Sequence, residues 1–174
     1  PTSPTSLTVG LSVTDVANVK RTNLFEKGLV SVVSIKLRDS RIDNGSIMID
    51  FSPGGISDWS FTRLTIEDTF EKKTKLFGVR DRSFLGRIWS DSKGVPFQER
   101  FTVEGAGSAA MLEKGYLRDA SSFYGDYDLR NQYHLPGDAN LRAFGNQNFI
   151  GVEGVFSNSF ETFIHKKFGP VSVE

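Results

Sequence analysis

The sequence predicts an all-β protein, and three observations support this class. The chain has 174 residues with 15 Phe and 17 Gly, a composition that favours strands and turns over helices. Several segments alternate apolar and polar residues, which is typical of half-buried strands. Residues that favour turns recur between these segments. Together they predict about eight or nine short strands in a single-domain β-sandwich or jelly-roll-like barrel, with one short helix and a long loop.

The first two predicted strands differ in their patterns. Residues 7–13 alternate apolar residues with polar or small ones, as expected of a strand that is buried on one face only. In residues 29–38, Val30 and Val32 make both faces apolar. A strand that is apolar on both faces is typical of a sheet with a layer on either side. We therefore expect a central strand here.

A hairpin is predicted directly after this strand. Asn44 and Gly45 both tolerate positive φ angles, so this pair favours a two-residue hairpin turn. Ile47, Ile49 and Phe51 then line one face of the returning strand. Further strands are predicted at residues 59–66, 75–79, 84–89, 97–103, 149–156 and 160–165.

The remaining segments complete the predicted organisation. One short helix is expected, capped by Ser108 and ending near Gly115. Residues 119–148 are rich in Ser, Tyr, Asp, Asn and Gly, and predict a long loop. Residues 1–6 are interpreted as a flexible linker or processed end, and residues 7–174 as one β-rich domain.

Composition excludes several kinds of site. Lys plus Arg and Asp plus Glu both number 21, which argues against strong, salt-driven nucleic-acid binding by the chain as a whole. Cysteine is absent, so disulfides and cysteine-ligated zinc are excluded. No apolar run approaches the roughly 20 residues of a membrane helix, and we expect no membrane span. The two histidines, His134 and His165, are not in a metal-ligand spacing. We expect no enzyme activity, metal or cofactor.

A basic segment with interleaved aromatic residues is the candidate nucleic-acid contact. Basic side chains can contact phosphates while aromatic rings stack on bases, which is how many proteins bind single strands. The alternative interpretation is a pair of strands with one charged and one aromatic face. The candidate contacts are Lys72, Lys73, Lys75, Arg80, Arg82, Arg87 and Trp89.

Asp39 and Arg41 form an Asp-x-Arg pair where the strand before the hairpin ends. Asp39 can accept hydrogen bonds from backbone N–H groups of the following turn. Arg41 can pair with Asp39, with Asp43 or, across the hairpin, with Asp50. An exposed pair of this kind contributes roughly 0 to 1 kcal/mol. These contacts give a structural reason for both residues.

The segment SVVSIKLRDSRIDNGSIMIDFSP also resembles the hallmark of the thirty-kilodalton superfamily of plant viral movement proteins. The resemblance covers about residues 29–53, with Asp39 as the Asp of the motif and Arg41 as its basic partner. It implies a non-enzymatic viral protein with a jelly-roll-related core. Such a protein binds single-stranded nucleic acid without sequence preference. It acts inside the host cell, at plasmodesmata.

Another function remains open. A self-assembling viral structural protein, either capsid or matrix, would use the same jelly-roll-like sandwich and reside in the virion. Both interpretations predict a homo-oligomer. An enzyme on a β-scaffold is the third class, and the sequence nominates no catalytic residue for it.

Overall fold

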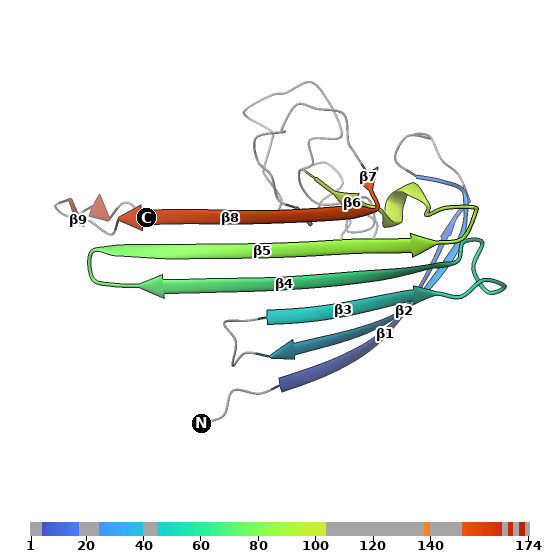
Figure 1. The fold of residues 1–174 in the computed structure, drawn as a ribbon, viewed down its shortest axis with the longest axis horizontal. Coiled ribbons are helices and arrows are strands. Elements are labelled where there is room, and N and C mark those ends of the chain that lie inside the picture. The colour runs from blue at the N-terminus through green and yellow to red at the C-terminus, as the bar shows by residue number, and fades with distance from the viewer. Residues whose placement is uncertain are drawn as a thin grey trace, which may run out of the picture.

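The computed structural model is dominated by one antiparallel sheet of six strands in the order β1-β2-β3-β4-β5-β8 (Figure 1). The structure describes residues 5–17, 25–39, 45–103, 138–139 and 151–164, and the backbone of 167–168 and 171–172. The sheet strands are β1 (Thr5–Val16), β2 (Gly28–Asp39), β3 (Gly45–Ser52), β4 (Phe61–Lys73), β5 (Phe77–Ser90) and β8 (Gly154–Ile164).

Shorter elements accompany this sheet. They are the 3-10 turn η1 (Phe97–Glu99), β6 (Phe101–Thr102), β7 (Gly151–Val152), β9 (Lys167–Phe168) and β10 (Val171–Ser172). β6 pairs with β7, and β9 pairs with β10. The all-β class is confirmed, and the arrangement is sandwich-like because η1, β6 and β7 lie over one end of the sheet (Figure 1). The six sheet strands follow each other in sequence order, which makes a meander.

The predicted hairpin is confirmed, because β2 and β3 pair in register from Val33 with Phe51 to Asp39 with Gly45. The predicted two-residue turn at Asn44-Gly45 is wrong, because Gly45 is already a paired residue of β3 and residues 40–44 separate the two strands. The turn itself, including Arg41, lies outside the described residues. β1 begins at Thr5, so the last two residues of the expected linker belong to the strand. The expected helix near 108–115 is also outside the described residues, as is the loop 119–148 except for Asp138 and Ala139.

Five of the predicted strands need correction. The segments 75–79 and 84–89 fall in one strand, β5, which begins at Phe77 and in which Arg80 to Ser83 continue the pairing with β4. The segments 149–156 and 160–165 similarly form β7 and most of a single long strand, β8. Residues 97–103 were expected as a strand, but they begin with η1, in which the Glu99 N–H donates to the Pro96 carbonyl at 2.9 Å.

The hydrophobic core lies on one face of the sheet, near one end of its strands. Its largest members include Trp59, Phe61, Phe84 and Phe101, all at most 4% exposed. β2 was expected to be covered on both sides, but only its Val30 and Val32 reach the core, while Val33, Ile35 and Leu37 on the opposite face are exposed. Among the described residues, no helix is long and apolar enough to cross a membrane.

Candidate interaction surface

The side of the sheet opposite the core carries a continuous set of apolar side chains, called here the apolar face. Cross-strand partners in an antiparallel sheet point to the same side, so the strand register assigns each residue to a face. Members of the apolar face are exposed or half-buried. They are Leu7, Val9, Leu11, Val13, Val33, Ile35, Leu37, Ile47, Ile49, Phe51, Leu64, Ile66, Leu85, Trp89 and Phe156.

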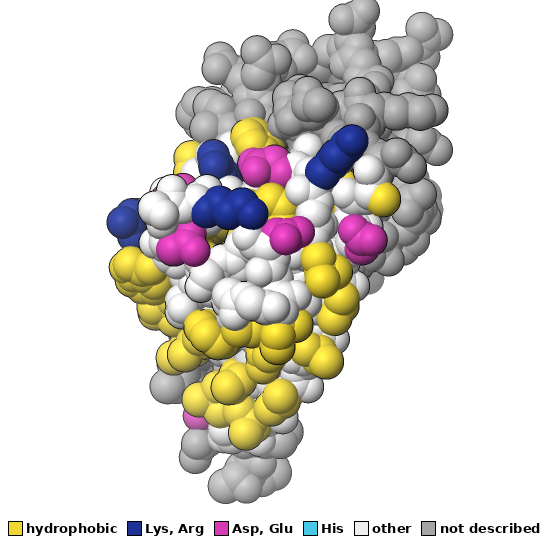
Figure 2. All heavy atoms as spheres, turned by 90° about the vertical axis from the view of Figure 1, so that its right-hand side faces the viewer, with side chains coloured by type: hydrophobic (Ala, Val, Ile, Leu, Met, Phe, Trp, Pro, Cys, Tyr) yellow, Lys and Arg dark blue, Asp and Glu magenta, His cyan; other side chains and the backbone are white. Residues whose placement is uncertain are grey.

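This surface is unusual for a protein surrounded by water. Leu11 is 75% exposed and Ile35, in the middle of the sheet, is 46% exposed. Fully burying one such side chain is worth roughly 1.5–3 kcal/mol, so leaving more than ten half exposed forfeits on the order of 10 kcal/mol. That is comparable with the net stability of a domain, about 5–15 kcal/mol. An exposed apolar surface of this extent is typical of interaction sites, which makes the apolar face the candidate interaction surface. Figure 2 shows hydrophobic side chains gathered at the level of β1 to β3, with charged ones above them.

The margins of the apolar face are chemically different from its centre. At one margin, Phe51 and Trp89 belong to the same cross-strand row. At the other, the next row along the strands is polar and contains Asp68, Ser83 and Asn158. There the Asn158 Nδ2 donates to the Ser83 Oγ at 3.0 Å. Aliphatic residues thus occupy the centre, while aromatic and polar residues lie around it.

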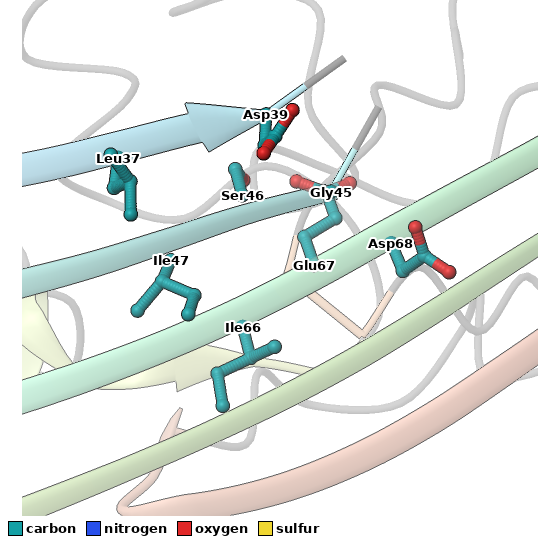
Figure 3. A pocket seen from close by; sticks show the side chains of 8 residues that line it. All are labelled: Leu37, Asp39, Gly45, Ser46, Ile47, Ile66, Glu67 and Asp68. Atoms are coloured by element: carbon teal, nitrogen blue, oxygen red, sulfur yellow. The ribbon is translucent and has the colours of Figure 1, made fainter. Parts of the chain in front are cut away.

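Asp39 lies at this polar margin, beside a shallow pocket of about 230 Å³. Leu37, Ile47 and Ile66, from three neighbouring strands, line its apolar part (Figure 3). Asp39 and Asp68 are also among its lining residues, although the surface of the pocket is almost wholly apolar. Of the Asp-x-Arg pair, only Asp39 is therefore placed. Asp50, one of the expected partners of Arg41, instead forms an ion pair with Arg63.

The structure does not bring the candidate nucleic-acid contacts together on one surface. Side chains alternate across a strand, so they divide between the two faces of the sheet. Lys72, Arg87 and Trp89 are on the apolar face, Lys73, Arg80 and Arg82 are on the opposite face, and Lys75 is in the turn between β4 and β5.

Three of these basic residues are also engaged in ion pairs. Lys73 and Arg80 both contact Glu71, at 2.6 and 3.1 Å, while Arg82 contacts Glu67 at 2.7 Å. Contacts with Lys73 and Arg80 hold the pKa of the Glu71 carboxyl below its usual value. These pairings favour the alternative of a charged sheet face over a dedicated phosphate-binding row.

The opposite side of the sheet, called here the covered face, contains a buried ionic network that the sequence did not predict. Arg63 of β4 donates from Nε to the Asp50 carboxylate at 2.7 Å, and from Nη1 to the Glu99 carboxylate at 3.3 Å. Asp50 is only 1% exposed. Burial lowers the pKa of the Arg63 guanidinium, but Asp50 and Glu99 more than offset this, so the pKa lies above its ordinary value. This network joins β3, β4 and η1.

A second polar contact holds Asp138 against the same side. Its carboxylate accepts hydrogen bonds from the Thr102 backbone N–H, at 2.8 Å, and from the Thr102 hydroxyl, at 3.4 Å. Arg82 donates to the Asp138 backbone carbonyl at 3.0 Å. Burial raises the pKa of the Asp138 carboxyl, and the contacts with Thr102 and the arginines reverse this only in part.

Asp138→Asn is expected to flatten the pH dependence of stability. A carboxyl whose folded pKa is raised supports the folded state below its unfolded pKa, about 3.9, and this support is lost as pH rises through the folded pKa. Asn keeps an acceptor for the Thr102 N–H but carries no charge. Urea unfolding at several pH values from 4 to 7 measures the effect. A wild-type stability that does not fall relative to the variant as pH rises would contradict it.

Nothing in the described part of the chain indicates a catalytic or metal site. No cluster of metal-ligating side chains is present there. The histidines His134 and His165 lie outside the residues whose side chains are described. Comparison of the chain with protein-family models, with curated proteins and with solved structures finds no significant match. The resemblance to movement proteins therefore stays a prediction.

Proposed function

We propose that this chain is a non-enzymatic structural protein whose apolar face lies against the hydrocarbon of a lipid bilayer. The observation that carries this proposal is the extent of the apolar face, which continues from β1 across all six strands of the sheet. Its centre is aliphatic, and its aromatic residues Phe51 and Trp89 share a row at one margin. Membrane-facing sheets have the same distribution, with an aliphatic band and aromatic residues at the interfaces.

The length of the strands also supports contact of the sheet with a lipid bilayer. β1, β2, β4 and β5 have 12 to 14 residues, whereas strands of water-soluble proteins usually have about 5 or 6. A strand needs roughly 9–11 residues to cross a bilayer. Contact of one face of the sheet with hydrocarbon does not require a membrane-crossing helix, and the described part of the chain contains none.

The distribution of charge is a further support. Asp50, Arg63 and Glu99 are paired on the covered face, while the opposite face presents aliphatic side chains outward. A protein in water usually exposes its charges and buries its aliphatic residues, whereas here this ionic cluster is buried beside the core while many aliphatic residues are exposed. Arg87 does lie on the apolar face, two residues from Trp89. Its long side chain can extend toward the margin, where the charged group stays hydrated.

The two tryptophans of the chain provide a test. Trp89 is on the apolar face and 52% exposed, whereas Trp59 is in the core and 4% exposed. We expect vesicles of phosphatidylcholine with brominated acyl chains to quench the fluorescence of Trp89 after the chain is diluted into them from urea. Trp89→Phe should lose most of this quenching, and Trp59→Phe should retain it.

Two results would overturn the lipid proposal. One is equal quenching in the two single-tryptophan variants, because Trp59 has no route to lipid. The other is a chain that remains dissolved in buffer as a species of defined mass and does not float with the vesicles. If that species is a stable dimer, the apolar face is a protein interface, as expected of a self-assembling structural protein. Binding of single-stranded oligonucleotide by a species that ignores the vesicles would favour the movement-protein function.

A further inference from the structure

The outer edges of the sheet form a second surface, which the proposed lipid contact does not explain. β1 and β8 stand at opposite ends of the strand order, and in the described part of the chain no strand pairs with the outer side of either. Each edge therefore turns a row of backbone N–H and C=O groups outward. These edges are long, with 12 residues in β1 and 11 in β8.

Neither edge has the features by which proteins usually prevent pairing with another chain. Edge strands are commonly interrupted by bulges or carry Lys or Pro. β1 reads TSLTVGLSVTDV and pairs with β2 without interruption from Thr5 to Val16. β8 reads GVFSNSFETFI and contains a single charged residue, Glu161. Both sequences favour the addition of another strand.

The direction and facing of the two edges make them complementary. All five neighbouring pairs in the sheet are antiparallel, so β1 and β8 run in opposite directions. A β8 placed outside β1 would continue the antiparallel order. In the register that sets Ser12 opposite Ser159, Phe160 would lie opposite Leu11 and Ile164 opposite Leu7, so that the apolar side would continue from one copy into the next.

We propose that β8 of one copy of this chain pairs, edge to edge, with β1 of the next copy. The inference goes beyond lipid contact and does not depend on it. It agrees with lipid contact, however, because a backbone group without a hydrogen-bond partner is especially unfavourable in hydrocarbon. A second copy is the partner that offers a strand of matching length, opposite direction and continuous facing.

Cysteine crosslinking tests this pairing, since the chain has no cysteine of its own. One tagged chain carries Ser12→Cys, and a chain with a different tag carries Ser159→Cys. Ser12 and Ser159 both point to the covered face, and Ser12 is exposed while Ser159 is half-buried. Mixed and oxidised in vesicles, and separately in detergent micelles, they should form a disulfide-linked species of doubled mass that carries both tags.

Asn158→Cys is the matched control, because Asn158 is the neighbour of Ser159 and points to the apolar face. Its link to Ser12→Cys should be lost or much weaker, since the two thiols lie on opposite faces of the joint sheet. Equal crosslinking of Asn158→Cys and Ser159→Cys would overturn the proposal, as would the absence of any product with both tags. Links only between two copies of Ser12→Cys would also overturn it, by indicating pairing of β1 with β1. If the crosslinking test fails but the lipid quenches Trp89 selectively, the pairing of β8 with β1 is overturned and the proposed lipid contact is retained.

Discussion

Asp50→Ala is expected to lower the free energy of unfolding by about 3 kcal/mol, the lower end of the range for breaking a buried ion pair. The side chain of Asp50 is 1% exposed, and its Oδ2 accepts a hydrogen bond from the Arg63 Nε at 2.7 Å. Removing the carboxylate leaves the guanidinium beside the core without its shortest contact. Glu99 remains at 3.3 Å, and this residual pairing is why we expect the lower end. Urea unfolding in detergent micelles gives the measurement.

The control for Asp50→Ala is an ion pair on the surface. Glu71 contacts Lys73 and Arg80 in solvent, so Glu71→Ala should leave the unfolding midpoint almost unchanged. A second comparison removes both charges, as Asp50→Leu together with Arg63→Met. This pair should recover part of the stability, because it removes the Arg63 charge together with that of Asp50, while Glu99 still loses its contact with Arg63. If Asp50→Ala lowers the free energy of unfolding by no more than Glu71→Ala does, the ionic network does not stabilise the fold.

The sequence was sufficient for the hairpin and for the all-β class. Asn44-Gly45 lies between two apolar stretches, and β2 and β3 form the expected hairpin, although Gly45 pairs with Asp39 as the first residue of β3 and is not part of a two-residue turn. It was not sufficient for strand length. The polar residues of β5 between its apolar ends were interpreted as a break, but pairing on both sides keeps them in the strand. Backbone hydrogen bonds to neighbouring strands do not depend on side-chain polarity, so composition alone underestimates such strands.

The candidate surface was visible in the sequence only as alternation. The pattern of Leu7, Val9, Leu11 and Val13 identifies one apolar side of a strand, but it does not say whether protein or something else covers that side. Only the register shows that these residues continue the apolar side of β2 and β3. The basic segment was misleading for a related reason. Its charges are close in sequence, but consecutive strand residues point to opposite faces.

The ionic network could not be predicted from sequence spacing. Asp50 and Arg63 become neighbours through the pairing of β3 with β4, and Glu99 joins them from η1. Asp50 was expected as one of three possible partners of Arg41, whereas Asp50 forms its ion pair with Arg63 of the next strand. Arg63 is the single charged residue of the predicted strand 59–66, and this was the available indication, because a buried charge needs a partner.

Phe101→Ala is expected to destabilise the protein by about 3–5 kcal/mol, the usual cost of truncating a buried aromatic residue. Phe101 is 2% exposed, and its ring meets that of Phe84 edge-on with 5.8 Å between the ring centres. It belongs to β6, so its ring is a direct link between the covering elements and the sheet. Urea unfolding compares the variant with wild type, and Phe97→Ala, at a partly exposed neighbouring position, is the control with a smaller expected loss.

The absence of a side chain at Gly86 explains how this ring comes so close to the sheet. A Cβ at Gly86 would lie 2.5 Å from the Phe101 Cζ, so Gly86→Ala should force the ring to move and cost about 1–3 kcal/mol. In the Phe101→Ala background that cost should largely disappear, because the space above Gly86 is then open. Additive effects in this double-mutant cycle would mean that the ring does not rest on Gly86. A coupling free energy of about 1 kcal/mol or more would show that the Phe101 ring packs against the sheet at Gly86.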